Sequence, residues 1–133
     1  MKKVVVIDAQ GGGLGKQIIS ALKAKDHDLH ITAVGTNSAA SSAMLKAGAD
    51  QAATGENAVK VCCRTADYII GPIGIAIADS ILGEVTPEMA LAVGQSPAKK
   101  LLIPMTQCDN IIIGYQKIPV SRMVEEILSV INS

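Results

Sequence analysis

The chain has 133 residues, of which 49% are hydrophobic and 18% charged, and its 12 basic side chains equal its 12 acidic ones. This composition excludes intrinsic disorder, and a net charge of zero gives no electrostatic support for nucleic acid or an anionic membrane as a partner. No apolar run reaches the ~18 residues that cross a bilayer, and the start MKKVVVID lacks the apolar stretch of a signal peptide. We therefore expect one domain over residues 1–133, in the cytoplasm, with three reduced cysteines.

The predicted elements alternate between strand and helix. A β-branched run over 4–7 predicts a strand that is covered on both faces. The helix after the glycine loop begins near Leu14, where apolar residues start to recur at helical spacing. Further strands are predicted over 31–36, 51–54, 67–72, 100–105 and 110–115. Further helices are predicted over 37–47, 56–66, 73–82 and 86–94, and from about 119 to the end.

This alternation predicts an α/β fold, a doubly wound and mostly parallel sheet of the Rossmann-like type with helices on both faces. In such a sheet the ligand lies beyond the carboxyl ends of the strands, where the strand order reverses. The loops that leave the predicted strands are rich in Gly and small polar residues, whereas the loops that enter them carry more charge. We expect a binding site at the carboxyl edge, although turns also favour these residues for conformational reasons alone.

The stretch DAQGGGLGKQ after the first strand fits two phosphate-binding patterns in part. In the dinucleotide fingerprint G-x-G-x-x-G, Gly12 and Gly15 fill the second and third places, but Gln10 stands at the first. In the P-loop pattern, Gly15 and Lys16 fit, but Gln17 replaces the hydroxyl residue that holds magnesium. We therefore expect no NTP hydrolysis. A turn that is packed closely for structural reasons is the remaining alternative.

The end of the second predicted strand lacks the acid that usually binds the ribose of a dinucleotide. No Asp or Glu occurs from Leu29 to Ala49. Thr36, Asn37 and Ser38 offer hydroxyl and amide donors there, and such donors suit a 2′-phosphate or another phosphorylated ligand. We expect NAD or NADP as the cofactor, with a slight preference for NADP, although no Arg is near these residues.

The first and fourth strands are expected to be neighbours, so that the glycine loop and GPIG face each other across one crevice. In this arrangement the phosphates lie on the glycine loop, the middle of the ligand lies beside GPIG, and the ribose end meets the loop after the second strand. The predicted cofactor-binding residues are Asp8, Gln10, Gly11, Gly12, Gly13, Leu14, Gly15, Thr36, Asn37, Ser38, Gly71, Pro72 and Gly74.

Four stretches together resemble a family of short bacterial proteins of unknown function that is found mostly in anaerobic firmicutes. They are VVVIDAQGGGLGKQI, GTNSAASSAMLKAGAD, ATGENA and GPIGIAIADSILGEVTPEMA, and the resemblance spans most of the chain up to about Met105. It implies a Rossmann-like fold and brings no catalytic assignment with it.

No catalytic residue follows from the sequence. Short-chain reductases need a Lys four residues after a Tyr, but Pro follows both Tyr68 and Tyr115 at that spacing. Cys108 follows the fifth strand on the ligand edge, yet no His is placed to generate its thiolate. Asp79 is expected in the middle of a helix, and a position facing the crevice is one alternative for its side chain. The stretch HDLH at 27–30 has spacing suited to a metal, but it precedes a strand and is expected to be a solvated loop.

Two carboxylates, Asp8 and Glu56, follow predicted strands, and each suits ribose binding or acid–base work as well as capping. Three classes of function fit these observations. The first is a small nucleotide-binding module, such as a sensor or accessory protein. The second is an oxidoreductase or transferase that acts with a partner subunit. The third is a structural protein that forms a homo-oligomer through its Ala-rich helices and binds no ligand.

Overall fold

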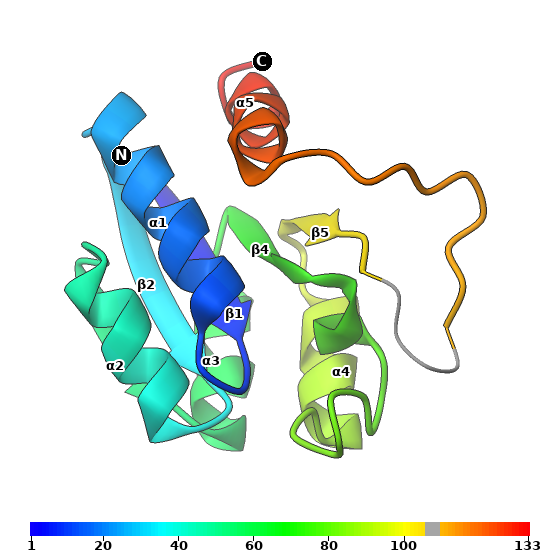
Figure 1. Ribbon diagram of the computed structural model, residues 1–133. Helices are drawn as coiled ribbons and strands as arrows, with labels where there is room; N and C mark the ends of the chain where they lie inside the picture. Colours follow the sequence, from blue (N-terminus) through cyan, green and yellow to red (C-terminus); the bar gives the residue numbers. More distant parts are fainter. Residues whose placement is uncertain (106–109) are drawn as a thin grey trace.

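The computed structural model describes residues 1–105 and 110–133 and is built on one parallel sheet (Figure 1). The strands are β1 (Lys2–Asp8), β2 (Leu29–Gly35), β3 (Gln51–Thr54), β4 (Tyr68–Pro72) and β5 (Lys99–Ile103). Their order is β3-β2-β1-β4-β5, and every pair is parallel. The predicted pairing of the first and fourth strands is confirmed, so the strand order reverses at β1.

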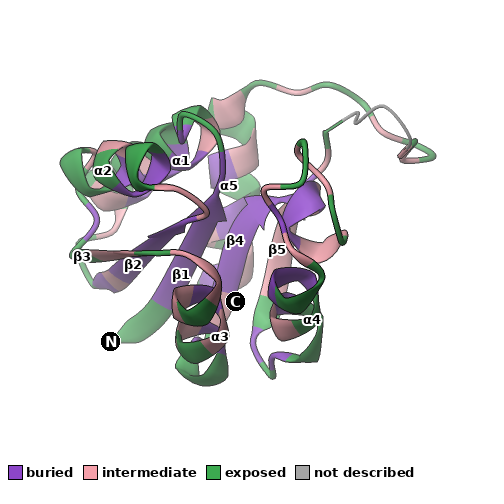
Figure 2. Cartoon of the chain, turned by 90° about the horizontal axis from the view of Figure 1, so that it is seen from below, coloured by how far each residue is buried: buried purple, intermediate pink, exposed green. Residues whose placement is uncertain are grey.

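Helices cover both faces of the sheet, as the sequence predicts (Figure 2). On one face lie α1 (Gly13–Lys25), α2 (Ser38–Lys46) and α5 (Val120–Ile131). On the other lie α3 (Glu56–Thr65) and α4 (Pro87–Gln95). A short 3₁₀ helix, η1 (Ile73–Ala76), follows β4. The architecture is therefore a Rossmann-like, doubly wound α/β fold.

The buried residues of β1 alternate between two cores. Val4 and Val6 belong to the core beneath α1, α2 and α5, whereas Val5 and Ile7 belong to the core beneath α3 and α4. Successive strand residues point to opposite faces, so a strand between two helical layers is apolar throughout. This central position of β1 places the loop that leaves it at the middle of the carboxyl edge.

The helix that the sequence predicts over 73–82 is wrong beyond η1. The chain turns back instead, because the N–H of Asp79 donates to the carbonyl of Val85 at 2.7 Å and Ser80 Oγ donates to the carbonyl of Gly74 at 2.5 Å. Asp79 is consequently exposed on a loop with φ near +64° and not in the middle of a helix. The buried isoleucine here is Ile75, with an exposed fraction of 1%.

The strand that the sequence predicts over 110–115 is also wrong. Only Asn110 forms an isolated bridge, and the residues after it are irregular. Ile111 and Ile113 are 79% and 91% exposed. The apolar run over 111–113 therefore lies on the surface.

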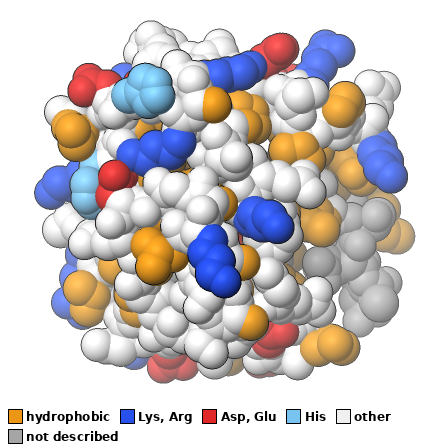
Figure 3. Space-filling view, turned by 60° about the vertical axis from the view of Figure 1, so that its left-hand side comes forward, with side chains coloured by type: hydrophobic (Ala, Val, Ile, Leu, Met, Phe, Trp, Pro, Cys, Tyr) orange, Lys and Arg blue, Asp and Glu red, His pale blue; other side chains and the backbone are white. Residues whose placement is uncertain are grey.

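Among the described residues, no helix combines the length and the hydropathy needed to cross a membrane. On the face drawn in Figure 3, basic, acidic and apolar side chains are interspersed. This mixture agrees with the balance of 12 basic and 12 acidic residues in the sequence.

Candidate functional site

The loop between β1 and α1 is drawn tight by backbone contacts. The N–H of Gly12 donates to the carbonyl of Ala9 at 3.0 Å, and the N–H of Lys16 donates to the carbonyl of Gly12 at 2.8 Å. Gly12 has φ +72°, and a Cβ there would lie 2.9 Å from the carbonyl oxygen of Ala40. The positive φ and the lack of space for a Cβ both require glycine at this position. Gly12 therefore lets the loop pack against α2.

Asp8 organises this loop from within. Its carboxylate accepts hydrogen bonds from the N–H groups of Ala9 at 2.8 Å and Gly15 at 2.7 Å. The residue is only 6% exposed. Burial raises the pKa of Asp8 above its ordinary value, the two N–H groups partly oppose this, and the charge of Glu84 adds to the rise. One of the free N–H groups at the start of α1 is thus taken by the protein itself.

Three other N–H groups, in the first turn of α1 and in the loop directly before it, remain available. The N–H groups of Gly11, Gly13 and Leu14 have no acceptor among the described residues. Helix N-termini carry partial positive charge and bind anions through such groups. A pocket of about 260 Å³ opens beside them. Its lining consists of Asp8, Ala9, Gln10, Gly11, Gly13, Leu14, Pro72, Ile81 and Met105.

The loop after β2 meets the glycine loop at this edge. The N–H of Thr36 donates to the carbonyl of Asp8 at 3.1 Å. Asn37 caps α2, because its Oδ1 accepts from the N–H of Ala40 at 2.9 Å, and its Nδ2 donates to the carbonyl of Gln10 at 3.0 Å. Ser38 begins α2, is exposed and does not line the pocket.

Glu84 joins these two loops, and its role was not predicted from the sequence. Its Oε1 accepts hydrogen bonds from the N–H of Gln10 at 2.8 Å, Thr36 Oγ1 at 2.7 Å and Asn37 Nδ2 at 2.8 Å. These donors hold the pKa of Glu84 below its ordinary value, with the Gln10 N–H contributing most. No motif surrounds Glu84 in the sequence. The only signal is indirect, namely the absence of an acid from Leu29 to Ala49.

The three predicted residues at the end of β4 and in η1 differ in whether they line the pocket. Pro72 lines the pocket, whereas Gly71 and Gly74 do not. A Cβ at Gly71 would collide with the backbone of Ile7, and a Cβ at Gly74 would lie 3.3 Å from the side chain of Ile81. The space that we expected beside these glycines for the middle of a ligand is therefore occupied by packed protein atoms, and Ile81 forms the wall instead.

Neither Glu56 nor the cysteines of α3 line this pocket. Burial raises the pKa of Cys63 to about 11 and also raises the pKa of Cys62, so both favour the thiol form. Glu56 accepts a hydrogen bond from Thr86 Oγ1 at 2.7 Å. Cys108 lies outside the described residues. Within residues 1–105 and 110–133, no cluster of His, Cys, Asp and Glu side chains is arranged to hold a metal ion.

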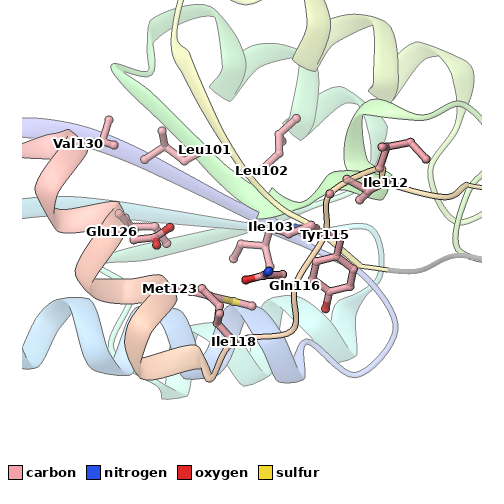
Figure 4. Close-up of a pocket in the computed structure, with 14 residues that line it drawn as sticks. Leu101, Leu102, Ile103, Ile112, Tyr115, Gln116, Ile118, Met123, Glu126 and Val130 are labelled. Carbon is pink, nitrogen blue, oxygen red and sulfur yellow. The ribbon is translucent and has the colours of Figure 1, made fainter.

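A larger pocket, of about 510 Å³, lies between β5, the segment 110–119 and α5 (Figure 4). Aliphatic side chains such as Leu101 and Ile103 dominate its lining, and Tyr115, Gln116 and Glu126 bring the polar groups. None of the predicted cofactor-binding residues lines it. The pocket that matches the sequence motif is therefore the smaller one at the glycine loop.

A parallel sheet whose order reverses at β1, with a glycine loop at that point, defines this chain as a Rossmann-like α/β protein. The chain belongs to the family described as "Domain of unknown function (DUF3842)", whose model matches residues 3–133. The resemblance to an uncharacterised family is thereby confirmed.

The comparisons with other known proteins assign no function to this chain. No curated protein matches the chain. One similar solved structure is described as a dodecameric FMN-dependent Ubix-like decarboxylase from Escherichia coli O157:H7. The two chains are 18% identical, with a TM-score of 0.47, and the match covers 99% of this chain and 77% of the other. A likeness this weak does not bear on the ligand of this protein.

Proposed function

We propose that the chain is a small nucleotide-binding module that holds a phosphate group of its ligand on the glycine loop, with NAD or NADP as the cofactor. One observation carries the proposal: the N–H groups of Gly11, Gly13 and Leu14 have no acceptor among the described residues and adjoin a pocket at the start of α1. The partial positive charge of the helix N-terminus favours an anion at this position.

The dimensions of the pocket limit which part of the ligand it receives. Its volume of about 260 Å³ lies below the ~300–1,000 Å³ of pockets that enclose a whole drug-sized ligand. It accommodates a phosphate and the group attached to it. The remainder of a dinucleotide would lie on the open carboxyl edge, toward Thr36 and Asn37 at the end of β2.

The side chains that line the pocket favour ligand binding over catalysis. Asp8 is the one titratable side chain in the pocket lining of the described residues, and two backbone N–H groups hold its carboxylate. An oxidoreductase or transferase would need further groups from a partner subunit. We also propose a homo-oligomer, since Ile111 and Ile113 leave apolar surface exposed.

The test uses Gly13→Val. A Cβ at Gly13 meets no atom within 4 Å, so the substitution fits the fold while it places a side chain in the pocket. We expect the affinity for NAD or NADP, measured by isothermal titration calorimetry, to fall at least tenfold, which is about 1.4 kcal/mol. Gly94→Val is the matched control, because Gly94 lies in α4 and a Cβ there also meets open space.

Equal affinity of wild type and Gly13→Val would contradict the proposal, as would a wild-type protein that binds neither NAD, NADP nor pyrophosphate. Gly12→Val is unsuitable as the test, because it would disturb the packing of the loop against Ala40. Native mass spectrometry of the purified wild type complements the titration. A single spectrum shows a retained nucleotide and the number of subunits.

A further inference from the structure

The carboxylate of Glu84 lies where dinucleotide-binding sheets place their ribose-binding acid. That acid normally comes from the end of the second strand, about 20 residues after the glycines. This chain has no acid between Leu29 and Ala49. Glu84 comes from the loop between η1 and α4, yet it contacts Thr36 and Asn37 directly after β2. The missing acid is therefore supplied by a different element.

Only one oxygen of this carboxylate is engaged within the described residues. Oε1 accepts all three hydrogen bonds, from the Gln10 N–H, Thr36 Oγ1 and Asn37 Nδ2, whereas no donor contacts Oε2. Because these donors hold the pKa of Glu84 below its ordinary value, the group is charged at neutral pH. An ionised carboxylate has about four acceptor sites on its two oxygens. Glu84 is thus fixed in place with capacity for further donors.

We infer that Glu84 recognises the ribose of the bound nucleotide: its Oε2 accepts a hydrogen bond from the 2′ hydroxyl while the glycine loop holds the neighbouring phosphate. This inference rests on the proposed nucleotide binding. Thr36 and Asn37 then act as positioning residues, since they orient the carboxylate and do not touch the ligand. The N–H of Gln10, in the glycine loop, donates to Oε1 of the same carboxylate at 2.8 Å. The proposed ribose position therefore lies next to the glycine loop.

The same arrangement selects against a 2′-phosphate. The donors that a 2′-phosphate would use, the Thr36 hydroxyl and the Asn37 amide, already donate to Glu84. A phosphate at this place would also lie beside a negative carboxylate, and like charges at close range repel each other. Glu84 therefore reverses the slight preference for NADP that the hydroxyl and amide side chains alone suggest, and NAD becomes the favoured cofactor.

The experiment titrates the full chain with ADP and 2′-deoxy-ADP, for wild type and for Glu84→Gln, which removes the charge and keeps the shape. A charge-assisted hydrogen bond supports an effect of about tenfold. We expect Glu84→Gln to lose at least tenfold in affinity for ADP and to bind 2′-deoxy-ADP within about twofold of wild type. Wild type should prefer NAD over NADP at least tenfold, and this preference should shrink in the variant. Glu88→Gln, on the exposed first turn of α4, is the control.

Retained 2′-deoxy-ADP binding shows that Glu84→Gln is folded with an intact phosphate site. Unchanged or tighter ADP binding by Glu84→Gln would overturn the inference, and the tighter case would mean that the carboxylate competes with the ligand for its donors. A wild type that binds pyrophosphate and ADP but does not distinguish ADP from 2′-deoxy-ADP also overturns the inference alone. A wild type that binds none of these probes overturns the proposed function as well.

Discussion

Gln10 has the backbone conformation of a glycine. Its φ is +51°, in the left-handed region that non-glycine residues rarely adopt. Gln10 stands at the first position of the dinucleotide fingerprint, where glycine normally makes the tight turn. The turn is therefore made without the glycine, because Gln10 itself adopts left-handed backbone at this position.

Asp50 gives a prediction about pH. Its Oδ2 accepts hydrogen bonds from Lys23 Nζ at 2.6 Å and the N–H of Ile31 at 2.7 Å, and these donors hold its pKa below the ordinary 3.8. A lowered pKa in the folded state adds stability above pH 3.8, which is lost as the pH falls through the folded-state pKa. The side chain is 37% exposed, so we expect Asp50→Asn to lower the free energy of unfolding by only about 1 kcal/mol at neutral pH.

Urea denaturation at several pH values checks this prediction. The difference between wild type and Asp50→Asn should be constant near neutral pH and should shrink below pH 3.8. Asp28→Asn is the control, because no hydrogen bond to the Asp28 carboxylate is found among the described residues. A difference that is independent of pH would show that Asp50 acts through something other than its charge.

The residues of the glycine loop were predictable and Glu84 was not, for a physical reason. Asp8 and the glycines follow a buried strand directly, so chain connectivity alone places them at the carboxyl edge. Glu84 lies 74 residues after Gln10 in the sequence, and the two meet only because the loop after η1 folds back across the edge. A single acid in a loop carries no periodic pattern, so its position depends wholly on tertiary structure.

At the scale of elements, the missing helix over 73–82 also has a physical cause. Ile73, Ile77 and Ile81 recur every four residues and therefore predicted a helix over 73–82. Each of these side chains is only partly buried, and Ile81 is part of the pocket wall. These isoleucines have helical spacing, but they do not form the continuous buried face that stabilises a helix. The strands and helices from β1 to β4 do bury apolar residues against the two cores, and their prediction is confirmed.

Strain in the loop between η1 and α4 gives a second prediction. Leu82 has φ +55° and is 95% exposed, so its side chain gains almost nothing from burial. Left-handed backbone costs a non-glycine residue about 1–2 kcal/mol, and a glycine costs about 0.4–1 kcal/mol in chain entropy. We expect Leu82→Gly to raise the free energy of unfolding by about 0.5 kcal/mol, as measured by urea denaturation.

The matched control is Leu91→Gly, which we expect to change the free energy of unfolding in the opposite direction. Leu91 is 50% exposed in the middle of α4, where glycine is less favourable than a good helix former by about 1 kcal/mol. Leu91→Gly should therefore be less stable than wild type. If Leu82→Gly and Leu91→Gly are destabilised equally, the loop stores no strain at position 82.

At the scale of the whole molecule, α5 completes the core on the face shared with α1 and α2. Ile131 and Val124 are fully buried there, although α5 comes last in the chain. We expect Ile131→Ala to lower the free energy of unfolding by about 3 kcal/mol, because it leaves a cavity in a packed interior. Ile113→Ala, at a position that is 91% exposed, should change it by less than about 0.5 kcal/mol. Denaturation midpoints that shift equally would mean that α5 is not part of the cooperative core.

The hydrogen bond from Lys2 Nζ to the carbonyl of Ile131 joins the two ends of the folded chain at the amino edge of the sheet, away from the glycine loop (Figure 1). Adjacent ends permit circular permutation. A short linker can connect residue 133 to residue 1, and new ends can be opened at the exposed Gly83. In such a protein β1 would lie in the middle of the chain. Glu84 would lie at a free N-terminus and would no longer be held in the loop between η1 and α4.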